Sequence, residues 1–407
     1  MEKQKTNWKE TLSSFKTLLS RNAILAILLN ISNQYTNGMR TGFRSLLGKS
    51  IGMSGTAIGL AFSIFTIAAM FMRTPTGSIA DQKRDKIKYI LAGGFVAKAL
   101  IFAAFALVKT PAMYYAVYII DGAVYSFIST IVPVILATSV DRRAMGSAYA
   151  IYMGLMQIAT ASSKSTGISI FNNQGQTRVA LTTAALSLIS VVLALCLDST
   201  KLSVKKSSNA PAAKKKGILS GLNVAMLPLA ICCGLCIFPN TVDGNFTALM
   251  AESKSFDYLS ALTLGSSVYG VMSIFSGFLC DIVSPALLIV ISYVGMITGF
   301  TMMGAATTSS IFCLGILLYQ CTRFWNSPFK IIGMKACANS EQGSFQATML
   351  LMTDVVTIFA STIAGMVADS MGYSMAFYLT SVVLAATLVL FLWLKKTGRI
   401  DERKTVE

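Results

Sequence analysis

An arginine lies in the middle of an apolar run in the carboxyl-terminal half of the chain. Arg323 follows Gln320 by one helical turn and precedes Trp325 and Asn326. A charge at such a depth is costly in a membrane and marks a functional position by default. A guanidinium flanked by an amide and by aromatic residues suits the bidentate capture of a carboxylate or phosphate. The alternative is a structural arginine that an acid such as Asp354 neutralises.

Two carboxylates also fall inside apolar runs. Asp354 lies near the middle of its run, and Asp121 lies in the outer half of an earlier one. A carboxylate shielded from water can bind and release a proton, so both are candidates for proton coupling. The alternatives are permanent ion pairs, in which Asp354 meets Arg323 or Lys98 and Asp121 meets Lys164.

The first apolar run carries a row of polar residues. Asn33, Gln34, Asn37 and Arg40 share one face because residues three and four apart align on a helix. Such a row in a membrane helix faces water or polar partners, which predicts a substrate-binding face. The alternative is hydrogen bonding between helices. Arg40 is expected toward the outer end, where it attracts anions at the mouth or extends its charged head to the interface.

The fourth apolar run has a second polar stripe. Tyr118, Asp121 and Tyr125 recur at helical spacing, and Gln157 of the fifth run occupies the position that corresponds to Asp354 in the other half. Tyr125 and Gln157 are therefore predicted to bind substrate. Lys98, in the middle of the third run, has no predicted role.

Membrane-spanning helices must position these residues. Of 407 residues, 54% are hydrophobic and 13% charged, against about 25% charged in soluble proteins. The apolar runs reach the length of a spanning helix and lack the two-residue alternation of barrel strands. We therefore predict an all-α membrane protein with twelve spans. They lie at 22–46, 55–80, 87–108, 112–139, 144–170, 178–197, 218–249, 259–280, 284–306, 310–334, 342–368 and 373–394.

The spans form two sets of six. A Lys/Ser/Ala/Pro segment separates them, as in a flexible linker. Most of the 34 Lys and Arg lie at the ends, in the linker and in the even-numbered connections, which predicts a cell (inner) membrane protein with both termini cytoplasmic. The predicted parts are an N-terminal segment 1–21, a first half 22–197, a linker 198–217, a second half 218–394 and a tail 395–407.

Several classes of chemistry are excluded or disfavoured. The chain has no His, which excludes His-based catalysis and ligation. The eight Cys are scattered, mostly within apolar runs, and are interpreted as packing residues. A Walker A motif is absent, so ATP is not the expected energy source. The net charge of +17 follows the membrane topology and does not predict nucleic-acid binding. No cofactor, metal or cleavable signal peptide is expected.

The halves repeat one pattern. Gly77-Ser-Ile-Ala-Asp81 recurs as Gly277-Phe-Leu-Cys-Asp281, each after a long apolar run. Gly146 and Gly343 open a second pair of matching segments at a similar offset. A membrane chain built from two similar halves indicates a transporter, because substrate can bind between halves that rock around it. The end of the seventh run, 239–245, is a polar stretch predicted to be broken by Pro and to form an outer gate.

Residues 77–86 resemble the signature loop G-x-L-A-D-R-x-G-R-K of the major facilitator superfamily. Gly77, Ala80, Asp81 and Lys86 match it. The family's Arg, Gly and Arg are replaced in turn at 82, 84 and 85, which changes the basic end of the motif. The resemblance implies the major facilitator fold, with helices 1, 4, 7 and 10 around a central cavity. It also implies that Asp81, with Gly77, Arg84 and the degenerate copy Asp281, acts in gating on the cytoplasmic side.

These observations predict a secondary active transporter and not an enzyme. It is expected to move a small organic anion, a carboxylate or a phosphate-like compound, by alternating access, either with protons or by exchange. It is expected to act as a monomer in the lipid bilayer. The alternative is a proton-coupled drug or metabolite exporter of the same fold. Such exporters carry Gly-Pro-x-x-Gly-Gly in the fifth helix and an Arg before a Gly in the fourth, and this chain has neither.

Overall fold

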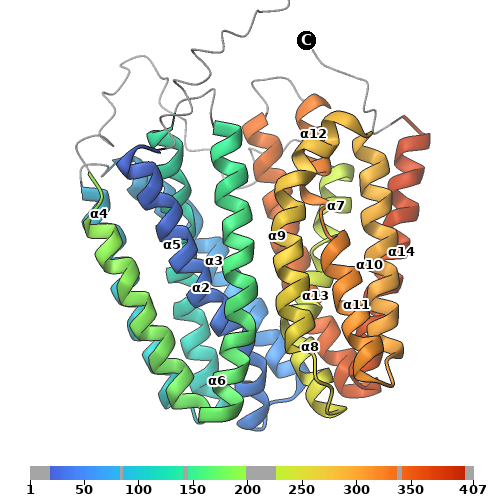
Figure 1. The fold of residues 1–407 in the computed structure, drawn as a ribbon, viewed down its shortest axis with the longest axis horizontal. Helices are drawn as coiled ribbons and strands as arrows, with labels where there is room; N and C mark the ends of the chain where they lie inside the picture. The colour runs from blue at the N-terminus through green and yellow to red at the C-terminus, as the bar shows by residue number, and fades with distance from the viewer. Residues whose placement is uncertain (1–18, 83–85, 141–144, 199–225, 337–341, 399–407) are drawn as a thin grey trace, which may run out of the picture. The chain divides into compact units, whose positions relative to one another are not determined.

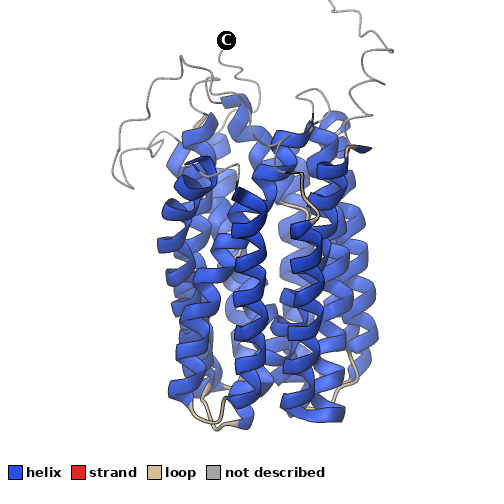
Figure 2. Ribbon diagram, turned by 90° about the vertical axis from the view of Figure 1, so that its left-hand side faces the viewer, coloured by secondary structure: helices blue, strands red, loops and turns tan. Residues whose placement is uncertain are grey.

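The structure, a computed structural model, is all helical in the part that it describes, residues 19–82, 86–140, 145–198, 226–336 and 342–398 (Figures 1 and 2). The first half contains α2 (Arg21–Ser50), α3 (Gly55–Gln82), α4 (Ile87–Ala104), η3 (Phe105–Leu107), α5 (Pro111–Ser139) and α6 (Met145–Leu195). The second contains α7 (Leu227–Leu235), α8 (Phe238–Ser253), α9 (Leu259–Ile282), α10 (Pro285–Ala305), α11 (Ser309–Thr322), α12 (Asn326–Ala336), α13 (Gln342–Met371) and α14 (Tyr373–Lys396). The predicted all-α fold is confirmed.

Among the described residues, eight helical stretches are long and apolar enough to cross a membrane. One of them belongs to α6, which has 51 residues, about 77 Å of helix and far more than one bilayer crossing. It covers the fifth and sixth predicted spans. Gly175 divides them, because its φ of 82° is a left-handed conformation that bends the chain and that glycine adopts without strain. The helices are consistent with twelve spans.

Two predicted spans are broken helices. The tenth is divided into α11 and α12 at residues 323–325, and the seventh into α7 and α8 at residues 236–237. In each case a proline, Pro328 or Pro239, lies in the first turn of the second piece. A proline there loses no intrahelical hydrogen bond, whereas inside a continuous helix it would clash with the preceding turn. The expectation of a continuous tenth helix was wrong for this reason.

The break in the seventh span lies before the stretch 239–245, which was predicted to be broken by Pro and to form an outer gate. The stretch 239–245 is not broken but forms the start of α8, and most of it is buried. Asp243 accepts a hydrogen bond from Thr247 at 2.9 Å, and Asn245 donates one to Ser361 at 3.1 Å. The polar residues there serve helix packing in this structure.

Contacts group the chain into two compact units. Unit 1 contains residues 1–40 and 67–207, and unit 2 contains 41–66 and 208–407. In unit 1, α4 packs against α5 and α6, around a core that includes Leu29, Phe95 and Ile131. In unit 2, α10 packs against α11 and α14. The predicted division into two halves and a linker stays a prediction, and nearly all of the linker lies outside the described residues.

Residues 41–66 join unit 2 through tight contacts with α13. The carboxylate of Asp369 accepts hydrogen bonds from the backbone amides of Gly55 at 2.6 Å and Thr56 at 2.7 Å, and from the Thr56 hydroxyl at 2.6 Å. Helix starts have free N–H groups and a positive dipole end, so a carboxylate is favoured there. Gly55 and Gly365 let the two helices approach until a Cβ on either would clash with the other's backbone or side chains.

Candidate functional site

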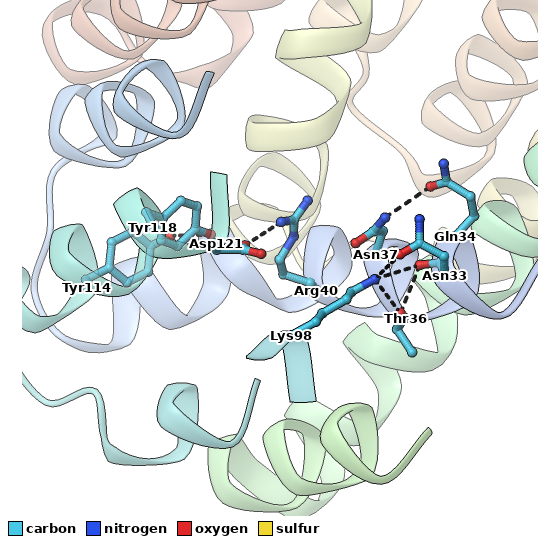
Figure 3. Close-up of polar contacts among 9 residues, drawn as sticks. All are labelled: Asn33, Gln34, Thr36, Asn37, Arg40, Lys98, Tyr114, Tyr118 and Asp121. Atoms are coloured by element: carbon cyan, nitrogen blue, oxygen red, sulfur yellow. Dashed lines mark hydrogen bonds and ion pairs between the residues drawn. The ribbon is translucent and has the colours of Figure 1, made fainter. Parts of the chain in front are cut away.

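In unit 1 the polar face predicted on the first span is present and largely buried. Asn33, Asn37 and Arg40 of α2 are each at most 4% exposed, and Gln34 is half-buried beside them. The Asn37 amide donates to the side-chain oxygen of Gln34 at 3.3 Å. Figure 3 shows these side chains along one stretch of α2.

Arg40 forms a buried ion pair with Asp121 of α5. Its guanidinium also lies 5.8 Å from the centre of the Tyr125 ring. Neither partner is accessible at an outer mouth, because their side chains are 5% and 1% exposed. The predicted alternative paired Asp121 with Lys164, whereas the partner seen in the structure is Arg40. The two opposite charges compensate each other, so this pair presents little net charge to a ligand.

Lys98 of α4 reaches the same face of α2. Its ammonium nitrogen lies 3.0 Å from the Asn33 carbonyl oxygen, 2.5 Å from the Asn33 side-chain oxygen and 2.9 Å from the Thr36 hydroxyl (Figure 3). The side chain is 1% exposed. Sequence reasoning gave Lys98 no role, because its partners lie more than sixty positions away on another helix.

In unit 2, Arg323 lies at the break between α11 and α12. Its guanidinium carbon lies 4.0 Å from the centre of the Tyr269 ring and 5.3 Å from that of Tyr319. It donates hydrogen bonds to Gln320 at 2.9 Å and to the Tyr319 hydroxyl at 3.2 Å. Aromatic faces and neutral oxygens thus hold this cation.

The guanidinium keeps unused binding capacity. Within the described part of the chain, no carboxylate oxygen lies within 4 Å of it. Its Nε is buried and has no acceptor there, and the same is true of the indole Nε1 of Trp325. The carboxylate of Asp243 of α8 acts electrostatically on Arg323. Two buried donors without acceptors at one helix break are a feature that an acceptor-bearing ligand would satisfy.

The other predicted residues are placed as follows. Gln320 is buried, Asn326 is exposed at the start of α12, and Gln157 is half-buried on α6. Asp354 is buried on α13, and no ion pair between it and Arg323 is found among the described residues. Of Gly77, Asp81 and Asp281 only the helical backbone is described, and Arg84 lies outside the described residues.

Two residues at this site were missed by sequence reasoning. Tyr319 precedes Arg323 by one helical turn, and its hydroxyl donates to the side-chain oxygen of Asn240 at 2.7 Å; the spacing was a usable signal. Tyr269 belongs to α9, and nothing in the sequence connects it to Arg323. Its ring position depends on helix packing.

The fold and these buried polar clusters are those of a multi-pass membrane transport protein. The family model of the Major Facilitator Superfamily matches residues 26–349, which is most of the chain. The chain belongs to this superfamily, as the signature loop predicted, and is a secondary transporter. No curated protein sequence matches it.

Solved structures show the same fold. A mutant form of the nucleoside transporter NupG is similar with a TM-score of 0.74 at 18% identity, over 92% of this chain and 100% of the other. A bacterial homologue of the human lysosomal transporter Spinster gives 0.74 at 10%, over 94% and 97%. The human organic anion transporter MFSD10 gives 0.59 at 13%, over 91% and 99%. Identities this low establish the fold and not the substrate.

Proposed function

We propose that the protein moves a small organic anion, a carboxylate or a phosphate-like compound, by alternating access, and that Arg323 binds the anion. The observation that carries the proposal is the guanidinium with no described carboxylate within 4 Å and with a buried Nε that has no acceptor. An anion would supply both the countercharge and the acceptor, and a charge-assisted bidentate contact is the strongest that a guanidinium makes.

Each unit has its own proposed substrate-binding residues. In unit 2, Gln320, Trp325 and Asn326 accompany Arg323. In unit 1 we propose the neutral amides of Asn33, Gln34 and Asn37, with Gln157. Arg40 and Tyr125 belong to that cluster, and the compensation of Arg40 by Asp121 makes Arg40 a positioning group. These assignments favour one strong charge contact and several weaker polar ones.

The remaining features belong to the same proposal. We propose a monomer in the cell (inner) membrane, with both termini cytoplasmic as the positive-inside pattern favours. Gating is assigned to Gly77, Asp81, Arg84 and Asp281, and transport is proton-coupled or an exchange. Asp354 and Asp121 are the carboxylates available for coupling. Asp121 is already engaged in an ion pair with Arg40, so Asp354 is the better candidate of the two.

The test is uptake and exchange in proteoliposomes. The panel contains monocarboxylates, dicarboxylates, phosphate esters, neutral nucleosides and organic cations. We expect saturable transport of at least one anion and of none of the cations. Arg323→Met should abolish it, and Arg323→Lys should keep part of it because the charge remains while the bidentate geometry is lost. Lys49→Met, which removes an exposed charge of the same unit, is the matched control and should transport normally.

The result that would contradict the proposal is transport of cations or nucleosides alone, or anion transport that Arg323→Met leaves unchanged. Transport of cationic drugs would instead favour the exporter. A thermal-shift screen with the same panel gives an independent readout, since a ligand that binds the folded state raises its apparent stability.

A further inference from the structure

Lys98 is a buried cation that has no role in the proposed anion site. It comes from α4, is 1% exposed, and directs its ammonium at three oxygens of α2. A charge inside a membrane protein is costly and indicates function unless it is neutralised. No carboxylate oxygen of the described residues lies within 4 Å of it, so neutral oxygens alone hold this ammonium.

Opposing effects act on its charge. Burial and the neighbouring positive charge of Arg40, from α2, oppose the ammonium, whereas Asp121, from α5, favours it. The three oxygen acceptors also favour the ammonium, and the Phe102 ring lies 5.2 Å away on the same helix. The other elements packed against α4 are α6 and η3, and α6 carries the buried Lys164. An ammonium that is buried among neutral oxygens can give up its proton when its surroundings change.

Loss of the proton would rearrange the hydrogen bonds of α2. A neutral amine has two N–H groups and one lone pair, so it cannot donate to all three oxygens. The Thr36 hydroxyl now donates to the Asn33 carbonyl oxygen at 2.9 Å. It could turn its hydrogen to the amine nitrogen, or the Asn33 amide could rotate to present its N–H. Either change alters the polar face that carries Asn37 and Gln34.

We propose that Lys98 binds and releases a proton during the transport cycle, in addition to any carboxylate that does so, and that Asn33 and Thr36 transmit its protonation state to the polar face of α2. The Nζ–H bond breaks, the electron pair stays on the amine, and the proton passes to water in the state that exposes the site. Protonation reverses the step. The inference rests on transport by alternating access but not on the charge of the substrate.

The experiment uses the proton itself as the probe. Membranes that contain the purified protein are adsorbed on a solid support, and a pH jump without substrate is applied while the charge displacement is recorded. We expect a transient in the wild type. Lys98→Arg, which stays charged, and Lys98→Gln, which stays neutral, should each reduce its amplitude at least about tenfold. Lys164→Arg, which alters another buried lysine of unit 1, should keep it.

A second measurement covers the case in which the Lys98 variants do not fold. The pH midpoint of the transient should move down by about one pH unit in Thr36→Val, which removes an acceptor of the ammonium, and up by a similar amount in Asn33→Asp, which adds a negative charge beside it. Opposite shifts support Lys98 as the titrating group.

The proposal is overturned if the wild type gives no transient, if Lys98→Arg keeps it, if Lys164→Arg removes it, or if both midpoints stay fixed. Failure of the anion proposal has a different signature, because it appears in the uptake panel and in Arg323→Met and leaves the substrate-free transient intact.

Discussion

Arg40 of unit 1, inside α2, and Arg323 of unit 2, at the break between α11 and α12, have opposite surroundings. Arg40 pairs with Asp121, whereas aromatic rings and neutral oxygens surround Arg323. A buried charge that is already paired has its countercharge in the protein, and removing the partner is costly. A charge without such a partner can receive one from a ligand. From this comparison we infer a structural role for Arg40 and a ligand-binding role for Arg323.

The largest expected effect tests the structural arginine. Asp121→Ala leaves the Arg40 guanidinium buried without its carboxylate, and the free energy of unfolding should fall by about 3–5 kcal/mol. Thermal unfolding in detergent, followed by fluorescence, measures it. Arg40→Met combined with Asp121→Leu should recover most of the loss, because both charges are then absent. Unfolding of Asp121→Ala at the wild-type temperature would remove the distinction between the two arginines.

Arg323→Met should have the opposite effects, with little change in stability and a large loss of anion binding. With no carboxylate left unpaired, stability should change by less than about 1 kcal/mol, while the binding of the transported anion weakens by about 2 kcal/mol or more, roughly thirtyfold. Thermal shift without and with the anion separates the two effects. A large stability loss with unchanged anion affinity would make Arg323 a structural residue as well.

Tyr319→Phe tests whether the Tyr319 hydroxyl only positions Arg323 or also contacts the ligand. The hydroxyl accepts from the guanidinium at 3.2 Å and donates to Asn240 at 2.7 Å, so its removal should lower stability by about 1 kcal/mol. Anion affinity should fall less than in Arg323→Met, since the ring remains under the guanidinium. The two affinities, measured in parallel titrations, decide the point; equal losses would show that the hydroxyl contacts the ligand.

The smallest effect is expected at the ion pair between Lys49 and Glu252. Its nitrogen and oxygen are 3.3 Å apart and the side chains are 41% and 55% exposed. Exposed pairs contribute about 0–1 kcal/mol and are screened by salt. Glu252→Gln should therefore leave the unfolding temperature close to that of the wild type at high salt. If Glu252→Gln lowered the free energy of unfolding as much as Asp121→Ala, burial would not determine how much an ion pair stabilises this protein.

The fold was predictable because run length and charge placement act locally along the chain. The same holds for the shared face of Asn33, Asn37 and Arg40.

The partners were not predictable. Asp121 lies 81 positions from Arg40 and Asn33 lies 65 positions from Lys98, and such pairings depend on how helices rotate and pack. No local pattern contains that information. Tyr269 reaches Arg323 for the same reason, from a helix whose sequence shows only apolar and small polar residues around it.

The hydrogen bonds to the carboxylate of Asp369 offer a way to follow the separation of α3 and α13 by hydrogen exchange. Amides at the start of a helix normally exchange their hydrogens with solvent rapidly, because no carbonyl precedes them to accept a bond. In Gly55 and Thr56 these amides are bonded to Asp369, so exchange there requires α3 and α13 to separate. Deuterium uptake at these two positions therefore reports how often these ends of α3 and α13 separate, without a label or a substrate.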